Sequence, residues 1–424
     1  MLSLQYIREN VDRVKRDVLL RNTTAPVDRI LQLDEERREL LQQVEGLRAK
    51  RNTVSKAIGA SKEASDREVR IAEMRLVGDE IDRLDGRLKK IETELQEKLY
   101  EVPNILDPNV PKGPDETSNK VVEVVGDLPQ FPFTPRPHWE LGEIVGGLDI
   151  ERGVKMSGSR FYTLKGPLAK LQRCLIQFML NEHGRAGFTE AYLPYMLNEA
   201  SLYASGQLPK FRDNLYRDAE EDYFFIPTAE VAFVNLYRDE IIPPGQLPMR
   251  FVGHTPCFRR EKMSAGRDVR GIKRLHQFEK VEMFVYCEPE QSAAEFDKLV
   301  ARARAIPELL GLPYRVLELC SGDIGFNATR TTDLEIWGPG QGEWLEVSSA
   351  SNCLEFQARR ANIRYRNVVD EPTRYPHMLN ASGLALPRTM ITVMENYQRE
   401  DGSIGIPEVL QPSMGMDVIP AAHG

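Results

Sequence analysis

A heptad pattern over residues 27 to about 101 is the feature that most constrains the fold of this chain. Apolar residues recur at alternating spacings of three and four over residues 30–58, and the pattern resumes over residues 74–95. Such spacing places one apolar stripe along a helix and is typical of a coiled coil. Residues 59–66 contain Gly, Ser and Asp and predict a break between the two halves. The pattern therefore predicts two helices packed as an antiparallel hairpin.

This hairpin has too narrow a core to be a catalytic domain. At 1.5 Å of rise per residue and about 30 residues each, its helices would project on the order of 45 Å. Arginines and lysines line both predicted helices, but acidic residues are at least as numerous. We interpret the hairpin as an arm that reaches a partner. A solvated coiled coil of mixed charge is an equal alternative on this evidence.

A proline-rich connection over residues 102–119 follows the arm and predicts a domain boundary. The 424 residues are too many for one ordinary core, so at least two domains are expected. We expect an N-terminal domain of residues 1–110, which begins with one short amphipathic helix over residues 1–24. Residues 111–424 would form the second domain.

The composition excludes several classes of protein. The formal net charge is −8, so any contact with nucleic acid must come from a local basic patch. The five cysteines include no C-x-x-C pair, which argues against a zinc knuckle and against a disulfide framework. No window offers 18 apolar residues, and the N-terminus lacks an apolar signal core. We expect a cytoplasmic protein without a membrane span.

Residues 251–287 read as a long β-hairpin. Two strand-like runs, 251–260 and 273–287, flank a polar, basic and Gly-containing loop at 261–271. Side chains alternate between the two faces of a strand. On the second strand the aliphatic face would hold Val281, Met283, Val285 and Cys287, and the opposite face would hold Arg274, His276, Phe278, Lys280 and Glu282. The second of these faces is a plausible binding floor, because the first strand ends beside it in Arg259, Arg260 and Glu261.

This hairpin resembles motif 2 of the class II aminoacyl-tRNA synthetases, and FRREKMSAGRDVRGIKRLHQFEKVEM is similar to the version in seryl-tRNA synthetases. GFTEAYLPYM at 187–196 resembles motif 1, whose usual role is a dimer interface, and MLNASGLALPRTMITVMENYQ at 378–398 resembles motif 3. FPFTPRPHWELGE at 131–143 looks like the start of the family's catalytic core, and SGQLPKF at 205–211 is also family-like. The loop at 261–271 departs from the usual run and is expected to meet the tRNA acceptor end.

The resemblance implies the fold and the activity. The fold would be α+β, with an antiparallel β-sheet catalytic domain flanked by helices and an N-terminal antiparallel helical-hairpin arm. The activity would be ATP-dependent ligation of L-serine to tRNA(Ser) through a seryl adenylate, in a homodimer whose arm grips the long variable arm of the tRNA. Whether tRNA(Sec) is also a substrate stays open. The residues themselves agree with displacement at phosphorus, because arginines, carboxylates and hydroxyls converge while no Ser-His-Asp set or phosphate-binding G-x-x-x-x-G-K-[ST] loop is visible.

The resemblance also implies the site residues. The catalytic residues would be Arg259, Arg388 and Glu346. Serine would be bound by Thr228, Ala229, Glu230, Arg259, Glu282, Asn380 and Ser382. ATP would be bound by Arg259, Arg260, Glu261, Arg274, Phe278, Glu346, Val347, Ser348, Ser349 and Arg388. Mg²⁺ would be bound by Glu346 and Ser349, and no zinc is expected.

Local patterns add three expectations about these residues. Strict alternation places Glu346 and Ser349 on opposite faces, so the strand must end or bulge there if both bind one metal ion. Thr228 precedes a helical pattern and could serve simply as its N-cap. Pro387 suits a first helical turn, which would place Arg388 at a helix start, where anions are favoured.

Two other functions are considered. The chain could be a synthetase-like enzyme that activates a small amino acid for a non-tRNA acceptor, but the intact heptads count against this. It could also be a coiled-coil binding protein with an inactive synthetase-like domain. That alternative predicts loss of Arg259, Arg388 or Glu346, and all three are present.

Overall fold

The computed structural model describes residues 1–60, 64–262 and 270–422. The chain divides into two compact units. One contains Leu2–Leu19 and Thr23–Pro103, and the other contains Met1, Leu20–Asn22 and Asn104–Gly424. We describe each by itself.

The N-terminal segment forms two short helices, α1 (Leu4–Glu9) and α2 (Val11–Leu20). The prediction of one helix over residues 1–24 is therefore wrong in this detail. Asn10 leaves the helical conformation, and its side-chain amide donates a hydrogen bond to the carbonyl oxygen of Tyr6 at 3.0 Å. Asparagine side chains compete with the helical backbone in this way, which explains the break.

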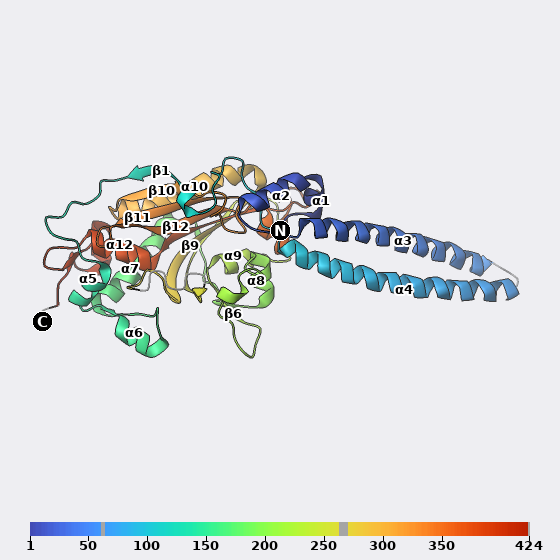
Figure 1. Ribbon diagram of the computed structural model, residues 1–424, viewed down its shortest axis with the longest axis horizontal. Coiled ribbons are helices and arrows are strands. Elements are labelled where there is room, and N and C mark those ends of the chain that lie inside the picture. The colour runs from blue at the N-terminus through green and yellow to red at the C-terminus, as the bar shows by residue number, and fades with distance from the viewer. Residues whose placement is uncertain (61–63, 263–269, 423–424) are drawn as a thin grey trace. The chain divides into compact units, whose positions relative to one another are not determined.

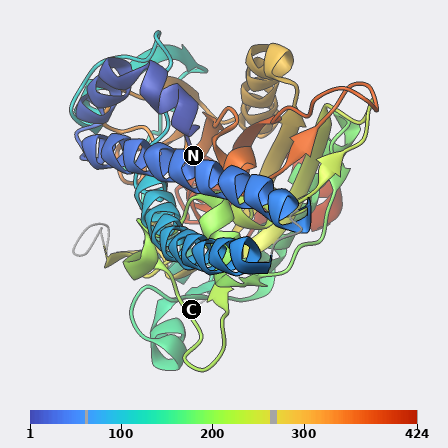
Figure 2. The same ribbon diagram turned by 90° about the vertical axis from the view of Figure 1, so that its right-hand side faces the viewer.

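The arm consists of α3 (Val27–Ala60) and α4 (Ala64–Tyr100), which lie side by side in both views (Figures 1 and 2). The fully buried part of its seam comprises Ile30, Leu33, Leu40 and Val44 of α3 and Ile81, Leu84, Ile91 and Leu95 of α4. Farther along, Leu47, Val54 and Met74 are only half-buried. The predicted helical hairpin is confirmed, while part of the predicted break at 59–66 lies outside the described residues.

The larger unit is built on an eight-stranded sheet with the order β1-β10-β11-β12-β14-β9-β8-β4. All neighbouring strands are antiparallel except β4, which pairs in parallel with β8. The strand bounds in that order are Lys120–Val125, Tyr314–Glu318, Arg330–Gly338, Glu343–Asn352, His377–Ala385, Gln277–Cys287, Met249–Phe258 and Thr189–Glu190. The predicted α+β fold with an antiparallel sheet is confirmed.

The two faces of this sheet have different neighbours (Figure 1). Helices α7 (Gly166–Arg185), α10 (Ser292–Leu309) and α12 (Leu386–Asn396) pack against the sheet strands. The core beneath them includes Val281, Met283 and Val285 of β9. Phe284 and Tyr286, which alternate with these residues, belong to a second cluster with α9 (Glu230–Val234) and α11 (Phe356–Arg360). The predicted alternation along this strand therefore separates two different environments.

Shorter elements complete the unit. The remaining helices are α5 (His138–Ile144), α6 (Ile150–Ser157), α8 (Glu199–Ser205) and α13 (Gln411–Met414), with 3₁₀ turns η1 (Glu116–Ser118), η2 (Arg212–Asn214), η4 (Pro289–Gln291) and η5 (Glu408–Leu410). The remaining strands are β2 (Leu148–Asp149), β3 (Thr163–Leu164), β5 (Met196–Leu197), β6 (Phe224–Phe225), β7 (Ile241–Ile242), β13 (Arg364–Tyr365), β15 (Ile404–Gly405) and β16 (Val418–Ile419).

Candidate active site

A polar pocket of about 340 Å³ lies where the ends of β8, β9, β12 and β14 meet the start of α12. It is lined by Gln207, Thr228, Glu230, Arg259, Glu261, Lys273, Arg274, Leu275, Phe278, Lys280, Glu282, Glu346, Val347, Ser349, Ser351, Asn380, Ser382, Ala385, Pro387 and Arg388. Arginines, carboxylates and hydroxyls from segments far apart in the sequence thus share one cavity.

The pocket contains most of the predicted site residues, but three do not line it. Ala229 is buried in the aromatic cluster beneath α9. The hydroxyl of Ser348 donates a hydrogen bond to the carbonyl oxygen of Ser382 at 2.5 Å, and the backbone N–H of Arg260 donates to the carbonyl oxygen of Asn214 at 3.0 Å. Each of the three is next in sequence to a residue that lines the pocket. Their expected contacts with ligands remain predictions.

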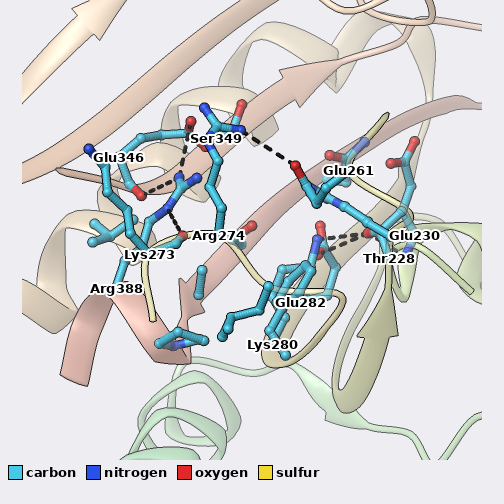
Figure 3. Close-up of a pocket in the computed structure, with 18 of the residues that line it drawn as sticks. Thr228, Glu230, Glu261, Lys273, Arg274, Lys280, Glu282, Glu346, Ser349 and Arg388 are labelled. Carbon is cyan, nitrogen blue, oxygen red and sulfur yellow. Dashed lines mark hydrogen bonds and ion pairs between the residues drawn. The ribbon is translucent and has the colours of Figure 1, made fainter. Parts of the chain in front are cut away.

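One side of the pocket is a small cluster of charges and hydroxyls (Figure 3). Lys280 forms an ion pair with Glu282, and its ammonium donates a hydrogen bond to Thr228 Oγ1 at 2.7 Å. The Thr228 hydroxyl lies 3.4 Å from Glu282 Oε2 and also accepts a hydrogen bond from the backbone N–H of Glu230 at 3.3 Å. The N-cap of α9 (Glu230–Val234) is Ala229 rather than Thr228, so the expectation that Thr228 caps this helix is wrong; Thr228 instead accepts a hydrogen bond from the first helical residue and lines the pocket.

Glu230 is the second carboxylate on this side. Its Oε1 accepts a hydrogen bond from the side-chain amide of Gln357 at 2.5 Å. Burial, and next the charge of Glu282, raise the pKa of Glu230 to about 7. The site therefore holds a carboxyl group that changes its charge near neutral pH, and a cationic ligand would favour its ionised form.

The opposite side of the pocket carries cations beside Glu346 (Figure 3). Arg388 is the third residue of α12, with Pro387 in the first turn as expected. Its Nη1 donates to the carbonyl oxygen of Glu346 at 2.7 Å and lies 3.3 Å from the carboxylate oxygen Oε2 of the same residue. Arg274 Nη1 lies 3.7 Å from Glu261 Oε2. A helix start with adjacent guanidinium groups is suited to bind phosphates.

Arg259 also lines this pocket. Its Nε donates a hydrogen bond to the carbonyl oxygen of Pro227 at 3.2 Å, and its guanidinium is 5.1 Å from the centroid of the Phe278 ring. The backbone bond and the ring contact both restrict the side chain. Arg259 is thus a restrained guanidinium among the residues that line the pocket.

A β-bulge brings Glu346 and Ser349 into the same pocket. In the pairing of β11 with β12, Leu334 is opposite Ser348 but Glu335 is opposite Glu346, so Val347 is the extra residue. A bulge of this kind changes the face to which the following residues point. The sequence required that the strand end or bulge near Glu346 if Glu346 and Ser349 are to bind one metal ion, and the structure contains such a bulge.

The oxygen atoms around this bulge fit Mg²⁺. Asp333 is opposite Ser349 on β11, and its buried Oδ1 has no hydrogen-bond partner in the described part of the chain. Burial and then the charge of Glu346 raise the pKa of Asp333 well above its usual range. Residues 1–60, 64–262 and 270–422 contain no cluster of three or more His, Cys, Asp or Glu that could hold a metal ion by itself. A hard cation would therefore also need phosphate oxygens and water.

The structure corrects the predicted start of the second hairpin strand. β9 begins at Gln277 rather than at residue 273, so strand alternation applies to Phe278, Lys280 and Glu282 but not to Arg274. Arg274 reaches the pocket from the segment before the strand. His276 does not line the pocket, because its Nδ1 is 2.9 Å from the carbonyl oxygen of Arg259. Most of the loop expected to meet the tRNA acceptor end lies outside the described residues.

Sequence reasoning gave no role to several lining residues. Lys280 was placed on the correct face by alternation, but its ion pair with Glu282 was not predicted. Lys273, which pairs with Glu343 at 2.8 Å, was counted as a strand residue. Gln207 lies in a segment noted only for its similarity. A strand carrying Lys and Glu two residues apart on a ligand-facing side was the available signal for the first.

Comparisons with known proteins agree with this geometry. A family model described as "Seryl-tRNA synthetase N-terminal domain" matches residues 1–106, and one described as "tRNA synthetase class II core domain (G, H, P, S and T)" matches residues 210–397. The chain is 56% identical over 416 residues to a serine–tRNA ligase of Roseiflexus sp. (strain RS-1), covering 98% of each chain. The chain belongs to the seryl-tRNA synthetase family. The expectation of a class II synthetase, a serine–tRNA ligase, is thus confirmed.

Solved structures of seryl-tRNA synthetases have the same fold. The crystal structure of seryl-tRNA synthetase from Pyrococcus horikoshii complexed with ATP has a TM-score of 0.95, with 37% identity and full coverage of both chains. The cytoplasmic serine–tRNA ligase from Naegleria fowleri in complex with AMP has a TM-score of 0.89, with 28% identity over 100% of this chain and 99% of that one. These findings give no support to a synthetase-like enzyme with a non-tRNA acceptor.

The helices formed by the described residues are unsuited to crossing a membrane. None of them is both long and apolar enough to span a bilayer.

Proposed function

We propose that the pocket catalyses formation of seryl adenylate from L-serine and ATP, and then transfer of the seryl group to tRNA(Ser). The observation that carries this proposal is the arrangement of charges in one cavity. A carboxylate and hydroxyl cluster around Glu282 and a guanidinium and carboxylate cluster around Arg388 line opposite sides of the cavity, and Arg259 lines the same cavity. A zwitterion at the first cluster and a polyphosphate at the second would meet at Arg259.

In the first step an oxygen of the serine carboxylate attacks the α-phosphorus of ATP. The bond from that phosphorus to the bridging oxygen breaks, and pyrophosphate leaves. Arg259 would bind the serine carboxylate and the α-phosphate, while Arg274 and Arg388 would bind the β- and γ-phosphates. Their fixed positive charges would stabilise the oxygens on which negative charge develops.

The adenine end of ATP would lie over Phe278, with Glu261 contacting the base and Arg260, Val347 and Ser348 contributing through their backbone. The Arg259 guanidinium beside the Phe278 ring supports this position, because it restricts the ring at one end of the pocket. Mg²⁺ bound by Glu346 and Ser349 would supply further charge neutralisation at the phosphates.

Serine would be recognised by three kinds of contact. Its ammonium requires an anion, which Glu230 can supply when ionised. Its hydroxyl requires an acceptor, for which Glu282 is placed, with Thr228, Asn380 and Ser382 completing the polar wall and Ala229 behind it. A site built to bond a substrate hydroxyl rejects the analogue that lacks it by about 10⁴-fold or more. Alanine should therefore be a poor substrate.

In the second step the 3′-terminal hydroxyl of the tRNA attacks the serine carbonyl carbon, and AMP leaves. We propose that the arm, residues 27–101 of an N-terminal domain that ends near residue 110, grips the long variable arm of tRNA(Ser). Exposed Lys50, Arg51 and Arg75 support this, since they form no ion pair with any residue in the described ranges. We propose that the same arm would also be used if tRNA(Sec) is a substrate, which a charging assay with tRNA(Sec) would test.

We also propose that the chain is a homodimer that uses the segment at 187–196. Tyr192 is 87% exposed and Met196 is 51% exposed, which is unusual for large apolar residues so close together. Sedimentation at equilibrium should give a dimer, and Tyr192→Asp should shift it toward monomer. The proposed compartment is the cytoplasm, which the five free, buried cysteines support.

The activity itself is tested by ATP–pyrophosphate exchange with serine, alanine or no amino acid, followed by charging of total tRNA. Exchange that depends on serine and then charging of a serine-accepting tRNA support the proposal. Exchange with another amino acid in preference to serine would contradict it.

A further inference from the structure

His138 lies in the segment at 131–143 that no proposed role uses. It is the first residue of α5 and is completely buried. Its ring Nδ1 is 3.1 Å from Glu395 Oε1 on α12, and its ring Nε2 is 3.1 Å from the backbone nitrogen of Ile272. Because a backbone N–H can only donate, Nε2 must be the acceptor and Nδ1 must carry the proton. The contacts therefore select one neutral tautomer of His138.

Glu395 anchors the His138 ring, because its carboxylate is fully buried and is surrounded by hydrogen-bond donors. Besides the imidazole, it accepts hydrogen bonds from the backbone N–H of His138 at 2.9 Å, from the backbone N–H of Gly340 at 2.9 Å and from the side chain of Gln341 at 3.3 Å. A buried carboxylate needs such partners to remain in place. Helix α12, the turn after β11 and the start of α5 are thereby joined at one group.

The backbone of residues 271–272 is fitted closely against the imidazole. Gly271 has a φ of +75°, and a Cβ there would lie 2.1 Å from His138 Nε2, so both conformation and space require glycine. Ile272 is completely buried. The next two residues, Lys273 and Arg274, line the pocket.

The same helix that holds Glu395 also presents a pocket residue at its other end. Arg388 is near the start of α12, and its Nε lies 3.5 Å from the carbonyl oxygen of Lys273. Two hydrogen-bonded links seen among the described residues therefore connect the segment that carries Arg274 to α12. One is this weak contact within the pocket, and the other is the buried bond through His138.

We propose that His138 is a positioning residue for the nucleotide part of the pocket. Anchored by Glu395, its Nε2 holds the Ile272 N–H. That bond fixes where Arg274 lies relative to Arg388. The identity of the nucleotide rests on the proposed function, whereas the link from His138 to Ile272 does not.

Three substitutions separate the two hydrogen bonds of the ring. In His138→Gln the side-chain carbonyl reaches the position of Nε2 and can still accept from Ile272. In His138→Asn the amide lies near the position of Nδ1 and can donate to Glu395, but nothing reaches Ile272. His138→Ala removes both.

In serine-dependent ATP–pyrophosphate exchange, we expect the KM for ATP of His138→Gln to lie within about threefold of the wild-type value. We expect the KM for ATP of His138→Asn and of His138→Ala to rise about tenfold or more. The KM for serine should change less than threefold in all three.

Matched controls and a direct readout accompany this series. His377, a half-buried histidine outside the pocket, receives the same Gln and Asn substitutions, which should leave the KM for ATP unchanged. Amide hydrogen exchange of the peptide containing Ile272, in the enzyme without ligands, should become faster in His138→Asn and His138→Ala but not in His138→Gln. Thermal unfolding of each variant shows whether a loss reflects folding.

The outcomes decide between positioning and simple stabilisation. If His138→Asn restores the KM for ATP and His138→Gln does not, or if all three variants behave alike, the proposal is overturned. A wild-type enzyme without serine-dependent exchange would contradict the proposed function instead. In that case the exchange rate of the Ile272 amide would still decide whether His138 holds this segment.

Discussion

In the arm a single stripe of apolar side chains joins α3 to α4, whereas the catalytic sheet is packed on both faces. The fully buried part of the seam ends at Val44 on the outgoing helix and begins at Ile81 on the returning one. Beyond these residues the stripe is only half-covered. In the sheet, by contrast, β9 alternates fully buried Val281 and Val285 with equally buried Phe284 and Tyr286.

The charges of the two regions differ in the same way. Ion pairs of the arm, such as Arg48 with Asp85, have exposed partners that water and salt can replace. In the pocket the side chains of Lys280 and Glu282 are 8% and 2% exposed. Removing one partner of a buried pair leaves an uncompensated charge. Single substitutions should therefore have large effects in the pocket and graded effects in the arm.

The largest effect is expected for Arg259→Lys. Lysine keeps the charge but cannot form the planar, paired contacts with a carboxylate and a phosphate. We expect serine-dependent ATP–pyrophosphate exchange to fall about 10²–10³-fold, as for loss of one donor to a developing charge. The control is Arg250→Lys on β8, the strand that ends just before Arg259, where the arginine pairs with Glu295 outside the pocket. Near-normal exchange in Arg259→Lys would contradict the proposed role of Arg259 in binding the serine carboxylate and the α-phosphate.

A pH series examines the buried carboxyl of Glu230. Its pKa of about 7 means that the group is mostly neutral below pH 7 and mostly ionised above it. Because the serine ammonium needs the ionised form, the KM for serine should rise about tenfold from pH 8 to pH 6. In the unfolded chain a glutamate carboxyl has a pKa of about 4.3, so the folded state binds this proton more tightly. The protonated Glu230 therefore contributes to the free energy of unfolding at low pH, and this contribution is lost as the pH rises through about 7.

The matched variant is Glu230→Gln, which keeps the shape of the side chain and cannot titrate. Its KM for serine should be high at pH 8 and should change little down to pH 6. A wild-type KM for serine that is equally flat over this range would show that Glu230 does not bind the ammonium.

Substitutions of exposed arm cations should have smaller, additive effects. Lys50→Ala, Arg51→Ala and Arg75→Ala should each raise the KM for tRNA a few-fold. Each should also lower the slope of log binding constant against log salt concentration by about one, because one fewer phosphate is neutralised. Pyrophosphate exchange should not change. Glu73→Gln, at an exposed position on α4 close to Arg75, is the control. Equal effects of the cation variants and the control on tRNA binding would mean that these cations touch no phosphate.

A pair of glycines compares the two regions directly, with stability changes of opposite sign. A Cβ at Gly46 in the arm would meet no atom within 4 Å, so Gly46→Ala should stabilise the arm by about 0.5–1 kcal/mol. A Cβ at Gly383 in β14 would lie 2.7 Å from His183 Nε2 and 3.1 Å from Val281 Cγ1, so Gly383→Ala should destabilise the sheet by about 1–3 kcal/mol. Thermal and denaturant unfolding would measure both. Effects of the same sign would contradict the comparison.

The regular parts of both regions could be predicted from sequence because their patterns are periodic. The heptads of the arm and the alternation of Phe278, Lys280 and Glu282 follow from helix and strand geometry alone. The pattern could not show where β9 begins, because the positive φ of Gly271 and the contact of His276 with Arg259 depend on distant packing. It also required that the strand end or bulge near Glu346, but it could not show that a bulge lies at Val347.

Interactions between segments distant in the sequence were beyond prediction for the same reason. The ion pair of Lys280 with Glu282 lies within one strand and left a trace in the sequence. The bond from His138 to Ile272 joins residues 134 positions apart and left none. Family resemblance identified both segments, but only the folded backbone connects them.

The central claim is that adenylate chemistry belongs to the pocket and that the arm acts only in transfer to tRNA. It is tested most directly with a variant in which a short loop replaces residues 27–101, by measuring seryl adenylate in a single turnover and then adding tRNA(Ser). We predict adenylate formation within about twofold of wild type and a loss of at least about 100-fold in seryl transfer. Loss of adenylate formation in a folded variant, or undiminished transfer, would contradict the account.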